Sequence, residues 1–340
     1  MSEPASFRFC LAVVRRRLAV VGWAALAASL AGAPAPSYRV VGHYPLPEGA
    51  CSAVAIDAAA RRLYVGQGNL VRVLNADTGA VVGTIAPAPG VQGLELAPGL
   101  NRGFTANAGD DTVTEFDLKS GAVVQTVKTG GKSPVAICYD AEARRIFVAN
   151  RASGDLSVLA ADTGLVTDHV PLGGTLRALV SNGYGSLFVT AEDLSVLHVV
   201  DTHTLAALGD DPVAPGVGPG GLAIDPAGRR LFVACANGLM PIVDGDAGFV
   251  FQVLPIGSGS SAVVFDRSKQ ANPDGGPPWK ARILAASEQG VLAALRMNAF
   301  INYSFHDRSA IPAGARGLAF DPKTGRVLVA LPHEILVLGL

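Results

Sequence analysis

The sequence predicts an all-β protein, a seven-bladed β-propeller of four-stranded antiparallel blades. Three observations lead to this fold class. One segment recurs along the chain at a regular spacing, each copy contains several short apolar strands separated by turn residues, and the two ends of the chain carry the parts of one divided blade. Together they predict a single domain, 38–340, that closes on itself.

The repeat is visible when the segment 221–234 is laid over other parts of the chain. Copies that align with it without a gap lie at 53–66, 136–149 and 317–330. More divergent copies start at Gly93, Arg177 and Ala262. One column is aromatic or leucine in every copy, and it consists of Tyr64, Phe104, Phe147, Phe188, Phe232, Leu284 and Leu328. Its spacing of about 40–45 residues, apart from the copy that carries an insertion at 267–280, is the period of a propeller blade. Seven copies therefore predict seven blades.

Each copy follows the same order of strands and turns. A first strand such as Leu222–Ile224 and a second strand such as Leu231–Ala234 are separated by a polar turn. A third and a fourth strand follow, for example Val71–Leu74 and Val81–Ile85, and the turn between them contains glycine. Glycine there adopts the positive φ of a bulged hairpin. The strands are nearly continuous apolar runs, which is typical of sheets that are packed on both faces.

The ends of the chain complete this pattern. The last copy stops after its third strand, Ile335–Leu340, and has no outer strand. A strand that belongs to no copy, Tyr38–Tyr44, lies near the other end. We predict that these two strands pair and close the ring, so that deletion of either end opens the whole propeller.

The segment 1–33 has the order of regions found in a signal peptide. Arg15, Arg16 and Arg17 precede an uncharged run, 18–30, and small residues and prolines follow it. The run is short for a membrane span. We therefore predict a periplasmic or secreted protein with no membrane span after cleavage of this leader. An uncleaved N-terminal anchor and export by the twin-arginine route are alternatives that the sequence leaves open.

Composition narrows the classes of partner. The formal net charge is −1, and without residues 1–33, which hold four arginines and one glutamate, 23 basic and 27 acidic side chains remain. This acidic balance disfavours nucleic acid as a partner. Cys51, Cys138 and Cys235 form no metal-binding or haem motif, and we expect them to be small buried residues. No cofactor and no metal are predicted, and we expect a monomer.

Two segments resemble the signature of a known family. Phe104–Asn107 and Phe147–Asn150 are similar to the Tyr-Val-Thr-Asn sequence of YVTN-repeat propellers, and the nearest group is the YncE-like periplasmic proteins. The resemblance covers residues 38–340. It implies that the aromatic residue and the valine of the signature are core residues and that the asparagine shapes a turn. A role in DNA binding, attributed to YncE-like members, is disfavoured here by the acidic balance of the chain.

Propellers usually bind ligands at one end of the central channel, so residues that break their column near that end are candidates for a site. Glu95 lies in a column that is otherwise small or apolar, Arg177 in a column of alanine and glycine, and Arg316 just before a first strand. Convergence of the three would place two guanidinium groups as paired donors for an anion or a carboxylate. The alternative is a structural pair of Glu95 with an arginine that plugs the channel.

The turns between second and third strands add candidates around the same mouth. These are Asn107, Asn150, Arg151, Asn237, Glu288 and His333. Each of them has the alternative role of an ordinary turn residue. The insertion 267–280, with Trp279 as a candidate partner contact, is expected on the opposite face.

These observations favour a non-catalytic scaffold of the cell envelope that binds a small ligand or a protein. The first alternative is a propeller enzyme of the lactonase type, in which Glu95, Asn150, Asn237, Glu288 and His333 converge on one point. The second alternative is DNA binding of the YncE-like kind, which requires a strongly basic face.

Overall fold

The computed structural model describes residues 38–47, 49–266, 281–297 and 302–340. These residues belong to one compact unit, Pro36–Leu340. The predicted signal peptide at 1–33 and the insertion at 267–280, including Trp279, lie outside the described residues. Within the described ranges, no helix is long and apolar enough to cross a membrane.

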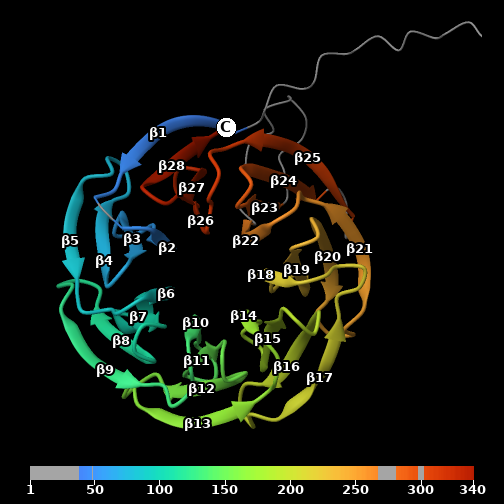
Figure 1. Ribbon diagram of the computed structural model, residues 1–340, viewed down its shortest axis with the longest axis horizontal. Helices are drawn as coiled ribbons and strands as arrows, with labels where there is room; N and C mark the ends of the chain where they lie inside the picture. Colours follow the sequence, from blue (N-terminus) through green and yellow to red (C-terminus); the bar gives the residue numbers. More distant parts are fainter. Residues whose placement is uncertain (1–37, 48, 267–280, 298–301) are drawn as a thin grey trace, which may run out of the picture. The chain divides into compact units, whose positions relative to one another are not determined.

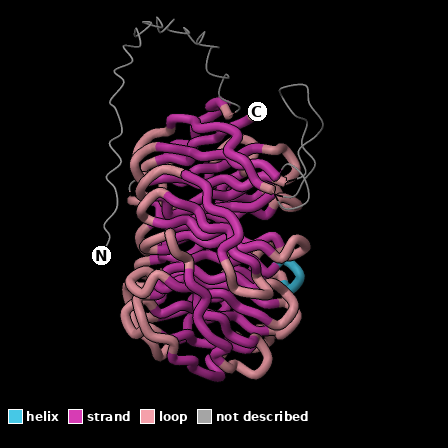
Figure 2. Tube along the Cα trace, turned by 90° about the vertical axis from the view of Figure 1, so that its right-hand side faces the viewer, coloured by secondary structure: helices cyan, strands magenta, loops and turns pink. Residues whose placement is uncertain are grey.

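Seven antiparallel sheets of four strands each form the fold, which confirms the prediction from the repeat. Figure 1 shows these sheets as blades around a common centre, with the first strand of each blade innermost and the fourth strand outermost. The loops gather on two opposite faces of the ring (Figure 2). A short 3-10 helix, η1 (Pro98–Leu100), precedes the second strand of blade two.

The strands are grouped here by their place in the blade, from blade one to blade seven. The innermost strands are β2 (Cys51–Asp57), β6 (Val91–Ala97), β10 (Pro134–Asp140), β14 (Leu176–Ser181), β18 (Pro219–Asp225), β22 (Ser260–Asp266) and β26 (Gly317–Asp321). The second strands are β3 (Arg62–Gln67), β7 (Arg102–Asn107), β11 (Arg145–Asn150), β15 (Ser186–Ala191), β19 (Arg230–Cys235), β23 (Arg282–Ser287) and β27 (Arg326–Ala330). The third strands are β4 (Leu70–Asn75), β8 (Thr112–Asp117), β12 (Asp155–Ala160), β16 (Val196–Asp201), β20 (Leu239–Asp244), β24 (Val291–Met297) and β28 (Glu334–Gly339). The outermost strands are β5 (Val81–Ile85), β9 (Val123–Lys128), β13 (Val166–Pro171), β17 (Ala207–Pro212), β21 (Val250–Pro255), β25 (Tyr303–Ala310) and β1 (Arg39–Pro45).

The seventh blade is closed by strands from both ends of the domain, as predicted. β1 pairs with β28 in antiparallel register, with Arg39 opposite Gly339. Tyr38, just before β1, accepts a hydrogen bond of 2.6 Å at its hydroxyl oxygen from the Arg282 guanidinium of blade six. The same guanidinium donates to the Asp266 carboxylate at 2.9 Å. The start of the domain is therefore tied to two blades.

The core lies between neighbouring blades. The side chains of the aromatic or leucine column, from Tyr64 to Leu328, are at most 1 % exposed. Phe104 of blade two packs in one cluster with Ile146 and Val148 of blade three. Full burial of a large apolar side chain contributes about 1.5–3 kcal/mol, so the continuous apolar strands of the repeat hold the blades together face to face.

The turn between third and fourth strands has the geometry that its glycines predict. Gly79, Gly121 and Gly164 have φ values of 74°, 73° and 67°. Beside this turn in blade one the strand register shifts between Val73 and Leu74, as a bulged hairpin requires.

Candidate functional site

Six innermost strands begin with a β-bulge. In blade one, Cys51 pairs with Gln67 and Ala53 pairs with Gly66, so the intervening Ser52 has no Cα partner in the strand ladder. Its hydroxyl donates to the carbonyl oxygens of Gly66 at 3.2 Å and Val91 at 2.6 Å. The same shift turns out one residue in four further blades, namely Gln92, Val135, Gly220 and Ser261. Bulges re-aim a side chain and are frequent beside functional sites.

Arg177 and Arg316 hold the equivalent positions in blades four and seven. Leu176 pairs with Ala191 and the register then shifts, so Arg177 is also turned out of the ladder. Arg316 directly precedes β26, and its N–H donates to the carbonyl oxygen of Ala330 at 3.0 Å. We call the resulting set of positions the bulge ring, and it consists of Ser52, Gln92, Val135, Arg177, Gly220, Ser261 and Arg316.

The strand pairing corrects the alignment of Arg177. Phe188 pairs with Val180, whereas the equivalent Tyr64 of blade one pairs with Ala55. The turn between first and second strands is therefore one residue shorter in blade four than in blade one. The gap-free alignment of the sequence placed Arg177 one position too deep in the channel, and it belongs to the bulge ring.

The bulge ring lines a polar cavity at one mouth of the central channel. The cavity has a volume of about 360 Å³, and its lining residues are Ser52, Gln92, Val135, Arg151, Arg177, Gly220, Ser261, Glu288 and Arg316. Every blade contributes at least one of them, so the cavity lies where all blades meet. Of the candidates from the sequence, Arg151, Arg177, Glu288 and Arg316 are brought together here.

The charges around this cavity are unevenly paired. The Glu192 carboxylate lies 3.3 Å from the Arg151 guanidinium and 3.5 Å from that of Arg177. Arg316 and Glu288 are exposed, and neither side chain forms a hydrogen bond or ion pair within the described part of the chain. Three guanidinium groups thus face one mouth, and only two of them share an internal carboxylate.

Glu95 does not belong to this cavity. It pairs with Phe104 on the neighbouring strand, and within the described residues its carboxyl forms no ion pair with Arg177 or Arg316. The backbone N–H of Tyr139 donates to the carboxyl, but burial is the larger effect and raises the pKa of Glu95 to about 7. The expected convergence of Glu95 with the two arginines, whether as a site or as a plug, is not seen.

Asn107 and Asn150 are turn residues inside their own blades. The Asn107 amide donates to the hydroxyls of Thr112 at 3.0 Å and Thr114 at 2.9 Å. The Asn150 amide donates to the Asp155 carboxylate at 2.8 Å. Both asparagines are 0 % exposed. This geometry matches the turn-shaping role that the family resemblance implies.

Asn237 and His333 lie outside the cavity as well. The Asn237 amide donates to the carbonyl oxygen of Pro215 at 3.0 Å, and its own oxygen accepts the N–H of Val217 at 3.2 Å. His333 is exposed, and its backbone carbonyl accepts the N–H of Leu46 at 2.9 Å, beside the closing strand β1. Both residues shape the loops around them.

The residues that could bind a metal do not gather at one point. No group of three or more His, Cys, Asp or Glu side chains with that arrangement occurs among the described residues. Cys51, Cys138 and Cys235 are free thiols. Burial raises the pKa of Cys51 and of Cys235 to about 12, which keeps both thiols protonated and unreactive.

Sequence reasoning missed Glu192. It directly follows the second strand of blade four, at the position that Arg151 holds in blade three and Glu288 in blade six. Reading that column through all blades would have found it, but the column was hidden because the turn signature of blade four is degenerate.

Comparison with known proteins gives the fold. No family model matches the chain, and no curated protein is similar to it in sequence. A solved structure of hydrazine synthase from Kuenenia stuttgartiensis is similar, with a TM-score of 0.71, 13 % sequence identity, and coverage of 88 % of this chain and 98 % of that chain. At this identity the likeness extends to the propeller fold alone.

Proposed function

We propose that the chain is a non-catalytic propeller of the cell envelope, exported by its first 33 residues, that binds an anionic small ligand at the channel mouth. One observation carries the proposal. Arg151, Arg177 and Arg316 line the same cavity of about 360 Å³, a size suited to a small organic acid. The YVTN-type resemblance of the sequence supports the placement in the envelope.

The internal carboxylate indicates what the ligand group would be. The Glu192 carboxylate lies within 3.5 Å of the guanidinium groups of Arg151 and Arg177. The spacing of these two guanidinium groups at the mouth therefore accommodates a carboxylate. Arg316 is the guanidinium left for a ligand, because it forms no side-chain bond within the described residues. A planar guanidinium donates two parallel hydrogen bonds to a carboxylate or a phosphate. A ligand with one or more acidic groups is therefore favoured over a neutral one.

The lactonase-type alternative receives less support. It requires Glu95, Asn150, Asn237, Glu288 and His333 at one point, and among these only Glu288 lines the cavity. The amides of both asparagines are engaged in their own loops. Ligand binding without catalysis requires only residues that line the cavity, whereas the lactonase-type reaction requires four residues that do not line it.

A thermal-shift screen tests the proposal. The panel contains succinate, citrate, glucuronate and phosphate, with gluconolactone, divalent metals with a chelator control, and duplex DNA as the arms for the alternatives. A ligand at about 100 times its dissociation constant stabilises a one-site protein by about 2.7 kcal/mol, which is a measurable shift of the midpoint. We expect acids to shift the midpoint and neutral compounds and DNA to leave it unchanged.

Variants locate the effect. Arg316→Ala should remove the shift produced by acids. Arg144→Ala is the matched control, since it removes the same charge from an exposed residue that pairs with Asp162 in the turn after β12. A metal- or lactone-dependent shift would favour the enzyme instead, and an acid-induced shift that survives in Arg316→Ala would reject the mouth as the site.

A further inference from the structure

The first residue of the second strand is an arginine in six blades, namely Arg62, Arg102, Arg145, Arg230, Arg282 and Arg326. Blade four has Ser186 at this position, at the start of β15. The surrounding sequence keeps the repeat, because β15 has the same burial pattern as β11, with one half-buried residue followed by buried ones. Blade four therefore lacks a guanidinium that the repeat supplies elsewhere.

Two of the arginines bridge to the next blade. Arg145 of blade three donates from Nη1 to the backbone carbonyl oxygens of Thr202 at 2.6 Å and His203 at 2.7 Å in blade four. Arg62 of blade one donates in the same way to the carbonyls of 118–119 in blade two. In both cases the acceptors are the two residues that directly follow the third strand of the next blade.

Two other arginines bond within their own blade. Arg102 donates to the Asp117 carboxylate at 3.2 Å, and Arg230 donates to the Asp244 carboxylate at 2.7 Å. Each of these aspartates lies directly opposite its arginine on the third strand. Side chains of directly opposite residues share one face of the sheet and are in contact distance.

Both kinds of acceptor surround Ser186, and no arginine reaches them. Gly245 and Asp246 directly follow the third strand of blade five, and within the described residues their carbonyl oxygens accept no hydrogen bond. Asp201 lies directly opposite Ser186 on β16. Its carboxylate accepts backbone N–H groups of its own turn, at 2.9 Å from His203, and forms no ion pair with a described lysine or arginine.

Two adjoining cavities form a groove between blades four and five, at the position where the repeat arginine is missing. Ser186, Gly245 and Asp246 line two cavities, of about 250 and 350 Å³, so the two spaces meet at Ser186. Between blades one and two, Arg62 itself lines both of the corresponding cavities, and its guanidinium donates to the carbonyl oxygens of Leu118 and Lys119. We call the open space at Ser186 the blade-four groove. It lies at the ends of β14 and β20, away from the bulge ring at the start of β14.

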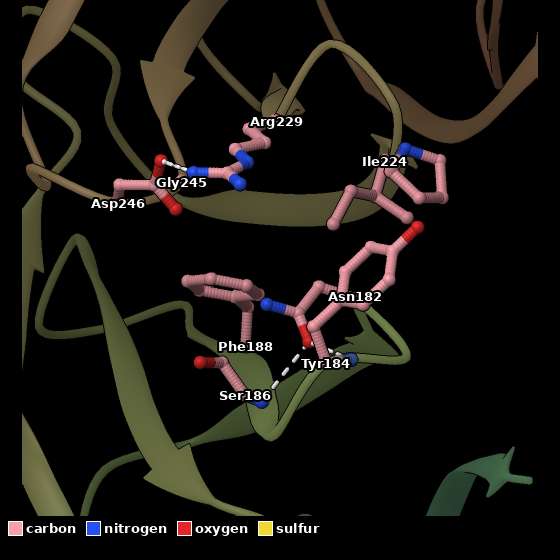
Figure 3. Close-up of a pocket in the computed structure, with 9 residues that line it drawn as sticks. Asn182, Tyr184, Ser186, Phe188, Ile224, Arg229, Gly245 and Asp246 are labelled. Atoms are coloured by element: carbon pink, nitrogen blue, oxygen red, sulfur yellow. Dashed lines mark hydrogen bonds and ion pairs between the residues drawn. The ribbon is translucent and has the colours of Figure 1, made fainter. Parts of the chain in front are cut away.

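The walls of the blade-four groove suit a cation. Figure 3 shows Tyr184, Ser186 and Phe188 of blade four facing Arg229 and Gly245 of blade five. Tyr184 is 73 % exposed, and aromatic faces of this kind attract guanidinium groups.

Two carboxylates accompany these walls. Asp246 is paired with Arg229 at 2.7 Å. Asp211 lines the second cavity, and its carboxylate forms no bond to a described residue. Burial raises the pKa of Asp211, and the negative charge of the neighbouring Asp210 raises it further. A bound cation would relieve this unfavourable position of a negative charge.

We propose that the blade-four groove binds a guanidinium group, contributed by an arginine side chain of a protein partner. The free carbonyls of Gly245 and Asp246, which line both cavities, supply the acceptors that Arg62 and Arg145 use in the next blade. The carboxylate of Asp201 lies opposite Ser186, outside the lining of either cavity. Exposed apolar side chains at the two cavities, Tyr184 and Leu208, supply contacts for residues next to the arginine in a partner. The site is separate from the channel mouth and does not depend on the function proposed there.

Calorimetric titration of the purified protein with blocked amino acids tests this proposal. The probes are acetyl-arginine amide, its neutral isostere acetyl-citrulline amide, free arginine, and the blocked tripeptide Leu-Arg-Leu. We expect the tripeptide to bind most tightly and citrulline at least about tenfold more weakly than arginine, because charge-assisted hydrogen bonds are lost.

Ser186→Arg gives the decisive comparison. It installs in blade four the residue that six other blades carry, so the fold should keep its thermal midpoint while an internal guanidinium occupies the groove. Affinity for the arginine probes should fall at least about tenfold. Ala80→Arg, the same charge change at an exposed turn of blade one, should leave it unchanged.

The opposite results are equally definite. Undetectable binding of every arginine probe, equal binding of citrulline, or unchanged affinity in Ser186→Arg would overturn the site. Free arginine binding as tightly as the tripeptide would overturn the protein partner and leave a free guanidino compound as the ligand. Tyr184→Ala provides a second readout, since it should weaken the arginine probes more than an acid bound at the mouth.

Discussion

Glu95 places a carboxyl group where the other blades place uncharged side chains. The residues that pair with the aromatic or leucine column are Ala55, Glu95, Cys138, Val180, Ala223, Val264 and Ala319. Burial raises the pKa of Glu95 from 4.5 to about 7. The carboxyl is therefore held partly protonated at neutral pH, and ionising it costs stability.

Glu95→Gln should make the protein more stable at high pH. Below pH 4.5 the carboxyl is protonated in both states, so the variant and the wild type should differ little. Between pH 4.5 and about 7 the unfolded state ionises first, so wild-type stability falls as the pH rises, and above about 7 the difference stays constant. We expect about 2 kcal/mol at pH 8, allowing for solvent screening of a half-buried group. Urea unfolding of both proteins at pH 4 and pH 8 measures it, and an equal difference at the two pH values would contradict it.

Arg282 is the buried cation that anchors the start of the domain. It is 1 % exposed, and it contacts the Asp266 carboxylate, the Tyr38 hydroxyl and the face of Phe320 at 5.0 Å from the ring centre. Arg282→Ala leaves Asp266 buried without this cation and should cost about 3–5 kcal/mol. Tyr38→Phe removes only the hydroxyl and should cost about 2 kcal/mol.

Chemical denaturation of the two variants separates these effects. The double variant should lose less than the sum of the single variants, because both changes remove the same Tyr38–Arg282 contact. Additive losses would show that Tyr38 and Arg282 act independently and would contradict the anchoring role.

At the residue scale, the sequence indicated which residues lie at the channel mouth better than it indicated which residues contact each other. Arg177 and Arg316 were found because they break their columns, and both line the cavity. The partner of Arg177 was not found, because Glu192 lies on the same blade after a different strand and only the pairing of β14 with β15 brings the two close. The arginines that begin the second strands were also visible in the sequence. Their role in joining neighbouring blades was not, because the carbonyl oxygens that accept their hydrogen bonds lie in the next blade.

At the element scale, strands were predicted well because apolar runs and turn residues recur with the blade. Val81–Ile85 was predicted with the bounds that β5 has. Other strands extend beyond the predicted apolar runs into the flanking turns, as β18 does at Pro219–Asp225, because backbone pairing continues beyond the apolar side chains. The two closing strands, β1 and β28, are each displaced by one residue from the predicted bounds. The shortened turn of blade four could not be located without strand pairing, since a gap-free alignment has no place for it.

The closing strand β1 is the element on which the ring depends. It supplies the outer strand of blade seven and buries Tyr44 in the cluster shared by blades one and seven. A chain that begins at Leu46 should therefore lack cooperative unfolding, since an open ring exposes apolar faces of two blades. The matched control begins at Pro36, where the compact unit starts. Circular dichroism melting checks this, and a cooperative transition in the shorter chain at the control's midpoint would contradict ring closure.

At the scale of the whole molecule, closure and binding are connected. The cavity at the channel mouth takes residues from every blade, so its geometry exists only when β1 and β28 have joined the ring. Without residues 1–33 the chain carries 23 basic and 27 acidic side chains. The net negative charge of this part of the chain does not attract acids to the molecule as a whole. Attraction of an acid therefore depends on the local positive charge of the three arginines at the channel mouth.

Calorimetric titration with citrate and glucuronate, each run on the wild type, Arg316→Ala and Arg144→Ala, tests the central claim most directly. We predict one site per chain for at least one acid, with affinity reduced about ten- to hundredfold by Arg316→Ala and unchanged by Arg144→Ala, because one charge-assisted pair is lost. Absence of binding for both acids, or equal loss in the two variants, would contradict an anion site at the channel mouth.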